Sequence, residues 1–233
     1  MASAPALPTS ASGDLGPAVC IPPNVKSLSD FREWAKSDDF PDRGRISYIA
    51  GDLVIDMSPE GLQTHIQVKA ELGSVLHRWC RKLGLGRFYP DGTLVTNIAA
   101  DLSTEPDGTV VRHRTIRSGR VRLIPHKSLA GEFIEIEGTP DIVIEVVSQS
   151  SVVKDTVKLR RDYHVAGIPE YWLVDARGEQ VRFQILLYRK AGYIEQALPG
   201  GWQRSRVFGR SFRLRRRRDE LGLWEYFLRD KVD

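Results

Sequence analysis

A glutamate interrupts an apolar, β-branched run of the chain. Residues 142–147 read IVIEVV, and Glu145 is the charged residue in that run. A carboxylate in a buried strand is costly unless it is paired, protonated or bound to a metal. Glu145 therefore marks a candidate active site.

Two further residues could complete a site of this kind. Asp107 ends the sequence EPD at the head of a predicted strand, and Lys158 lies on the helix predicted to follow the strand of Glu145. Two carboxylates on neighbouring strands repel each other, and a divalent cation such as Mg²⁺ relieves that repulsion. A nearby lysine would hold the attacking water or neutralise developing negative charge. The set favours metal-assisted phosphodiester hydrolysis over acyl transfer, because no serine or cysteine has an evident histidine partner.

Each of these residues also has an ordinary structural interpretation. Acidic residues beside strands are frequent, and a lysine on a helix is usually a solvated charge. Asp141 follows Pro140 and stands only four residues before Glu145, so it could simply cap the start of the strand. Asp175, just past another predicted strand, reads as a turn residue.

The predicted elements place these residues on an α/β framework. Strands are predicted at 46–50, 53–57, 88–96 with a break at 91–92, 108–114, 132–136, 142–147, 171–174, 181–188 and 193–198. Helices are predicted at 29–34 with Ser29 or Asp30 as N-cap, from Ser58 to about Gly84, and from Ser148 to about Ala166. This order indicates an α/β (α+β) sandwich with a mixed β-sheet flanked by helices.

Composition indicates an ordinary globular protein. The chain has 233 residues, with 41% hydrophobic and 27% charged residues, which suits one domain, predicted at 25–233. Residues 1–24 read as a disordered tail, because mixed Ala, Pro, Ser and Gly at its start form no continuous apolar core. The same stretch lacks the parts of a signal peptide. Cys20 and Cys80 form no metal-binding or disulfide pattern, and no segment is apolar enough to span a membrane. A cytoplasmic location is the simplest interpretation.

The net charge of +4 is compatible with a polyanionic partner but does not establish one. Two clusters carry much of the positive charge: Arg112, His113, Arg114, Arg117, Arg120 and Arg122 in one, and Arg213 with 215–218 in the other. Such clusters neutralise phosphates or form a solvated face, and neither shows a recognisable code for reading bases.

The segments that carry the candidate residues resemble a known family. EPD at 105–107, TPDIVIEVVSQSS at 139–151 and GIPEYWLVD at 167–175 resemble the Uma-two family of restriction-endonuclease-like proteins, within the PD-(D/E)xK nuclease superfamily. The earlier ISYIAGDLVIDMSPEGLQTHIQV, at 46–68, is similar to its opening hairpin and first helix. The resemblance spans roughly Phe31 to Tyr188. It implies a restriction-endonuclease-like core, DNA as the partner, and Mg²⁺, with Mn²⁺ possible, as the cofactor.

The resemblance also implies roles for individual residues. Asp107 would be the first metal ligand and Glu145 the second, with a backbone carbonyl near Val146 completing the set. The superfamily usually places its lysine two residues after the glutamate, where this chain has Val147. A lysine on the following helix is expected to replace it: Lys158 fits, and Lys154, one turn earlier, is the main alternative.

His65 matches a histidine on the family's first helix and would be an auxiliary ligand or base. A histidine packed between helix and sheet is the alternative interpretation. Together the residues and the resemblance predict a Mg²⁺-dependent endonuclease that hydrolyses DNA, with a homodimer as a reasonable assembly. Two other functions fit: a catalytically weak or inactive nucleic-acid-binding or regulatory protein with a nuclease fold, and a hydrolase of some other phosphoester.

Overall fold

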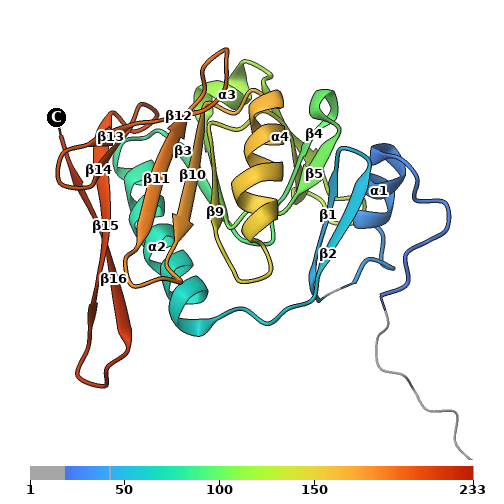
Figure 1. Ribbon diagram of the computed structural model, residues 1–233. Helices are drawn as coiled ribbons and strands as arrows, with labels where there is room; N and C mark the ends of the chain where they lie inside the picture. Colours follow the sequence, from blue (N-terminus) through green and yellow to red (C-terminus); the bar gives the residue numbers. More distant parts are fainter. Residues whose placement is uncertain (1–18, 42, 233) are drawn as a thin grey trace, which may run out of the picture.

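The structure is a computed structural model that describes residues 19–41 and 43–232 (Figure 1). Most of the tail predicted at 1–24 lies outside the described residues. Within the described part, Val19 packs against a cluster that contains Phe31 and Trp34. Phe31 and Trp34 lie on α1 (Leu28–Ala35), which is capped by Ser27, where the sequence suggested Ser29 or Asp30. The Ser27 side chain accepts a hydrogen bond from the Asp30 amide at 3.2 Å.

The central sheet carries the candidate residues. Its six strands lie in the order β12-β11-β10-β9-β6-β3. They are β3 (Gly86–Pro90), β6 (Gly108–Arg112), β9 (Ile142–Val146), β10 (Glu170–Asp175), β11 (Arg182–Leu187) and β12 (Ile194–Glu195). β9 runs parallel to β10 and antiparallel to β6, so the sheet is mixed.

Two more sheets flank it. The first has the order β2-β1-β5-β4-β8-β7 and consists of β1 (Arg45–Ile49), β2 (Asp52–Asp56), β4 (Leu94–Asn97), β5 (Leu102–Thr104), β7 (Val121–Pro125) and β8 (Phe133–Gly138). The other is antiparallel and consists of β13 (Ala197–Leu198), β14 (Trp202–Ser205), β15 (Arg210–Arg218) and β16 (Trp224–Lys231).

Helices cover both faces of the central sheet (Figure 1). The π-helical turn η1 (Leu62–Ile66) leads into α2 (Gln67–Lys82), which packs between the central and the C-terminal sheets. A second π-helical turn, η3 (Lys154–Lys158), leads into α4 (Leu159–Val165) on the opposite face. Short helices η2 (Ile98–Ala100) and α3 (His113–Arg117) lie in connections.

Alternation along β9 divides its side chains between the two faces. Ile142, Ile144 and Val146 belong to the core formed with α2, whereas Val143 belongs to the core formed with α4. Successive side chains of a strand point to opposite faces, so Glu145 points to the α4 side. The apolar run therefore serves two cores, which explains why it shows no polar face in the sequence.

The structure contains more strands than the sequence predicted. The Arg-rich C-terminal segment is β15, and the segment that follows it forms β16. Between the strands predicted at 108–114 and 132–136 the structure adds α3, which begins at His113, and β7. Within residues 19–41 and 43–232, no helix combines the length and apolarity that crossing a membrane requires.

Candidate active site

Asp107 joins the ends of two central strands. It immediately precedes β6, its side chain is 2% exposed, and its Oδ2 accepts a hydrogen bond of 2.7 Å from the amide of Val146. This contact places Asp107 beside the residue that follows Glu145. The structure thus brings the two predicted carboxylates to one end of the sheet.

Glu145 lies buried on the α4 side of β9. Its Oε1 accepts a hydrogen bond of 2.6 Å from the hydroxyl of Tyr163, whose oxygen also lies 3.1 Å from Thr104 Oγ1. Burial raises the pKa of Glu145 well above its usual value; Lys154 opposes this effect, and Asp155 and Asp107 add to it. A cation bound beside Glu145 would favour the ionised form.

Lys154 is the lysine whose positive charge acts on Glu145. It stands at the start of η3, and its side chain is 16% exposed. Burial would lower its pKa, but Glu145, Asp155 and Asp107 outweigh burial and raise it. Its Nζ lies 3.3 Å from Oδ1 of Asp155, which itself is buried and is bound through its other oxygen by Ser151. Lys154 therefore carries a positive charge into a mostly buried acidic pocket.

Lys158 points elsewhere. Its side chain is 42% exposed, and its Nζ pairs at 3.3 Å with Asp52, which is itself largely exposed. No contact joins Lys158 to Asp107 or Glu145 among the described residues. The structure brings Lys154, the alternative in the sequence, toward the carboxylates, and it does not bring Lys158.

His65 contacts Asp107 from the helical turn η1. It lies on η1, is 2% exposed, and places Nε2 3.4 Å from Asp107 Oδ2. Its Nδ1 lies 3.0 Å from Oε2 of Glu60, a residue that the sequence suggested only as part of a helix start. Burial opposes ionisation of Asp107, yet the contacts with His65 and Arg45 and the bond from Val146 keep the pKa of Asp107 below its usual value.

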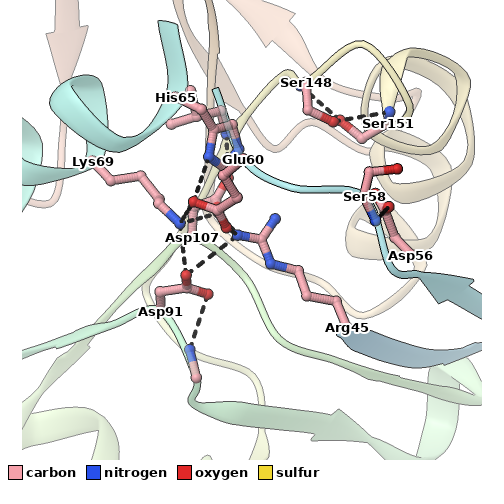
Figure 2. Close-up of polar contacts among 12 residues, drawn as sticks. Arg45, Asp56, Ser58, Glu60, His65, Lys69, Asp91, Asp107, Ser148 and Ser151 are labelled. Carbon is pink, nitrogen blue, oxygen red and sulfur yellow. Dashed lines mark hydrogen bonds and ion pairs between the residues drawn. The ribbon is translucent and has the colours of Figure 1, made fainter. Parts of the chain in front are cut away.

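Two basic side chains neutralise this acidic cluster (Figure 2). Lys69 Nζ lies 2.5 Å from Glu60, 2.6 Å from Asp91 and 3.7 Å from Asp107. Arg45 pairs with Glu60 and lies 3.3 Å from Asp91 and 3.4 Å from Asp107. Neither basic residue was singled out by the sequence, because they come from β1 and α2 and meet only in the folded chain.

A cleft of about 420 Å³ opens beside these side chains. It is lined by Gly44, Arg45, Asp56, Ser58, Pro59, Glu60, Asp91, Gly92, Glu105, Ser148 and Ser150. Arg45 and Glu60 therefore connect the buried Asp107 to open space. A substrate in the cleft would lie next to the acidic cluster.

The donor atoms suit a divalent cation. Atoms of Glu60, His65 and Asp107 lie within 4.8 Å of one another. Asp107 Oδ1 and His65 Nε2 are buried and have no hydrogen-bond partner among the described residues. Buried polar atoms normally have partners, so this pair is unusual. Carboxylate oxygens dominate the set, which favours Mg²⁺ or Mn²⁺ over softer metals.

Asp141, of the literal PD pair, has a structural role. It is fully buried and accepts hydrogen bonds from the Arg112 amide at 2.8 Å, Thr115 Oγ1 at 2.6 Å and Arg120 Nη2 at 2.6 Å. These bonds tie β9 to the helix α3. Asp175 pairs with Arg177 at 2.8 Å in the turn after β10.

Comparison with solved structures defines the class of fold. The chain matches the crystal structure of "a putative nuclease belonging to DUF820" from Anabaena variabilis with a TM-score of 0.55 and 19% sequence identity. The match covers 78% of this chain and 90% of that chain. The predicted fold class, a restriction-endonuclease-like mixed α/β core, is confirmed. No match was found among curated proteins.

The sequence itself identifies the family. The model of the Uma2 family, described as "Putative restriction endonuclease", matches residues 28–215. The chain belongs to the Uma2 family.

Proposed function

We propose that this protein is a metal-dependent endonuclease that hydrolyses phosphodiester bonds of DNA. The observation that carries the proposal is the cluster of Glu60, His65 and Asp107, whose donor atoms lie within 4.8 Å of one another, with Glu60 lining an open cleft. The hydrogen bond from the Val146 amide to Asp107 puts this cluster next to the strand position of Glu145. Membership of the Uma2 family and the nuclease-like fold support the same class of reaction.

Asp107 and Glu145 would hold the cation, with His65 as an auxiliary ligand or base and Glu60 as a further oxygen donor. When bound, Mg²⁺ or Mn²⁺ supplies positive charge to the phosphate and lowers the pKa of a coordinated water. Asp107 is suited to this role because its low pKa keeps it ionised. Tyr163 fixes one oxygen of Glu145 and so orients the other.

Lys154, in preference to Lys158, would stabilise negative charge on the phosphate. Its contact with Asp155 holds the amino group beside the carboxylates, and its raised pKa keeps it charged at neutral pH. This assignment retains the expectation of a lysine on the helix after β9 and moves it one turn toward the strand. Lys158, paired with Asp52 at the surface, would be dispensable.

The test is cleavage of supercoiled and single-stranded DNA with Mg²⁺, Mn²⁺ or a chelator. We expect cation-dependent cleavage that falls about 100-fold or more in Glu145→Gln and Asp107→Asn, as on removal of a catalytic charge. Asp52→Asn, which removes an exposed carboxylate, is the matched control and should cleave normally. Equal cleavage by wild type and Glu145→Gln would refute the site.

The same assay separates the other functions. Salt-sensitive DNA binding without cleavage under any cation would identify a binding or regulatory protein with a nuclease fold. Neither binding nor cleavage, with hydrolysis of a small phosphodiester, would identify a different phosphoesterase. A homodimer would place two sites on the two strands of a duplex, and light scattering on the purified chain tests that assembly.

A further inference from the structure

The C-terminal hairpin β15–β16 carries two distinct sets of arginines. Arg216 and Arg218 lie on the side that faces the body, where both stack on Trp224 at 3.9 Å and 3.6 Å from the ring centre. Arg216 also donates a hydrogen bond of 2.7 Å to the carbonyl of Ala176. Arg216 thus fastens the hairpin to the rest of the protein, whereas Arg218 contacts only the hairpin itself, at Trp224 and the carbonyl of Gly222.

The second set lies on the opposite face, which we call the outer arginine face. Strand alternation and register place these residues on it: Arg213, Arg215, Arg217, Arg229 and Lys231. Its one acidic residue on these two strands is Glu225, which pairs with Arg217 at 2.9 Å. Phe212, Leu214 and Leu228, on the other face, pack into the core with α2, so the arginine face points away from the body.

Positive charge on this face is left largely without acidic neighbours. Arg213 and Arg229 stand directly opposite each other, an arrangement of like charges that costs stability. Within the described residues, Arg215 and Arg229 form no ion pair, and Arg213 Nε is buried without a hydrogen-bond partner. Repulsion between like charges lowers the stability of this face, and an anionic partner that neutralises them would offset that loss.

Aromatic rings lie between the cations. Arg213 and Lys231 lie 4.6 Å and 4.8 Å from the ring centre of Trp202, and Arg217 lies 4.9 Å from that of Phe227. A shallow hollow of about 450 Å³ runs along this surface, lined mainly by arginines together with the same two rings. Asp230 also lines it, and this carboxylate is already paired with Arg210 at 2.7 Å. Rings that stack under guanidinium groups hold them in fixed positions toward an incoming phosphate.

The hairpin is connected to the candidate active site. The amide of Trp224 donates a hydrogen bond of 2.6 Å to Gln63, which lies on η1 two residues before His65. In Figure 1 the turn of the hairpin extends at the lower end of the view, the end where η1 and the loop after β9 also lie. A long polyanion that extends from the cleft past η1 would reach the hairpin.

We infer that the outer arginine face binds the phosphate backbone of duplex DNA and holds it beside the cleft. This inference rests on the proposed function for the identity of the polyanion, and the contacts above supply the surface. The match to the family model ends at residue 215, so β16 and three of the five residues of this face lie beyond the matched span. The face contacts backbone and reads no bases, because its groups are charges and rings without a donor–acceptor pattern.

The test measures binding separately from cleavage. Fluorescence anisotropy with a labelled duplex of about 20 base pairs, in a chelator, follows affinity between about 50 and about 200 mM salt. We expect Arg215→Gln/Arg229→Gln to weaken binding about tenfold at the lower salt and to reduce the slope of log affinity against log salt by about two. Its denaturation midpoint should be unchanged or raised, because like charges are removed.

The matched control is Arg114→Gln/Arg117→Gln, which removes the same charge from exposed positions of α3. It should change affinity by less than about twofold, since net charge alone is a weak contribution. Equal weakening in the two double variants would overturn the inference in favour of a general charge effect. Undiminished binding by Arg215→Gln/Arg229→Gln would also overturn it.

The proposed function fails in a different way. If the wild type cleaves DNA while the hairpin variant binds as tightly as wild type, the inference falls and the nuclease stands. If Glu145→Gln binds DNA normally and the hairpin variant binds weakly, with an unchanged single-turnover rate at saturating DNA, the inference stands. If the wild type binds no DNA, both fall.

Discussion

Tyr163 donates its hydroxyl hydrogen bond to Glu145 across 2.6 Å, between α4 and the central strand β9. Tyr163 is fully buried, so its phenyl ring also fixes the distance between helix and strand. This bond joins the packing of the helix to the orientation of the candidate metal ligand.

Tyr163→Phe should therefore affect both stability and activity. The lost hydrogen bond is expected to lower the free energy of unfolding by about 1–2 kcal/mol and to slow cleavage about tenfold, because Glu145 loses its fixed orientation. Tyr193→Phe is the control, since Tyr193 is also buried and donates to the carbonyl of Ile168 at 2.8 Å. Urea denaturation and cleavage rates check both; similar cleavage by the two variants would contradict the positioning role.

Lys154→Met should reduce cleavage far more than Lys158→Met. Lys154 faces the buried carboxylates, so its loss is expected to cost about 100-fold in rate. Lys158 is exposed and pairs with Asp52, so its loss is expected to change the rate by less than about threefold. Single-turnover cleavage at saturating DNA and cation measures both variants; the reverse order would assign the role to Lys158.

Lys69→Met should strengthen binding of Mn²⁺. Lys69 lies against Glu60, Asp91 and Asp107, so its ammonium group competes with a cation for the same oxygens. Removal of that charge is expected to raise Mn²⁺ affinity about tenfold, which corresponds to ~1.4 kcal/mol. Calorimetric titration measures the affinity, with Lys82→Met at the far end of α2 as control. Unchanged or weaker binding would show that the cation binds elsewhere.

Asp141→Asn should destabilise the protein at neutral pH without removing a site residue. Burial opposes ionisation of Asp141, but Thr115, Arg112 and Arg120 outweigh it and lower its pKa. The expected loss is about 3 kcal/mol, as for a broken buried ion pair. Cleavage per folded molecule should be unchanged.

The pH dependence of that loss has a definite sign. A carboxyl whose pKa is lower in the folded chain stabilises it above the unfolded pKa, and this contribution is lost as pH falls from about 4 toward the folded value. The gap between wild type and Asp141→Asn should therefore narrow below about pH 4. Urea midpoints over this range measure it, with Asp52→Asn as the exposed control. A gap that widens in acid would contradict the assignment.

The sequence located the carboxylates because their signal is local. Glu145 breaks an apolar strand, and a buried charge demands an explanation whatever the rest of the fold. In the structure Asp141 ties β9 to α3 by hydrogen bonds, and the role of Asp107 as a ligand stays a prediction. The mixed sheet and its flanking helices were predicted from the period of the hydrophobic residues and from the turn residues between the elements.

The choice of lysine could not be made from spacing. Lys154 and Lys158 lie four residues apart, so they occupy similar sides of the helix and differ by about 6 Å along its axis. Only packing decides which of them meets the strand end. Glu60, Arg45 and Lys69 were missed for a related reason, because separate elements bring them together through contacts distant in sequence.

The C-terminal strands were missed because an arginine run carries no apolar alternation on its outer side. β15 shows alternation only at Phe212 and Leu214, and Trp224 stabilises the rest by stacking on Arg216 and Arg218. Stacking of this kind replaces the apolar contacts on which sequence patterns depend.

Because side chains alternate along β9, the number of residues before Glu145 decides which face of the sheet its carboxylate points to. One residue inserted between Asp141 and Glu145 would turn the carboxylate from the α4 side to the α2 side, because a shift of one exchanges the two faces of a strand. Two inserted residues would restore the direction but move the carboxylate about 7 Å along the strand. The number of residues from Asp141 to Glu145 thus sets both the face and the position of the carboxylate. A homologous chain that changes this number by one cannot keep this arrangement of the site.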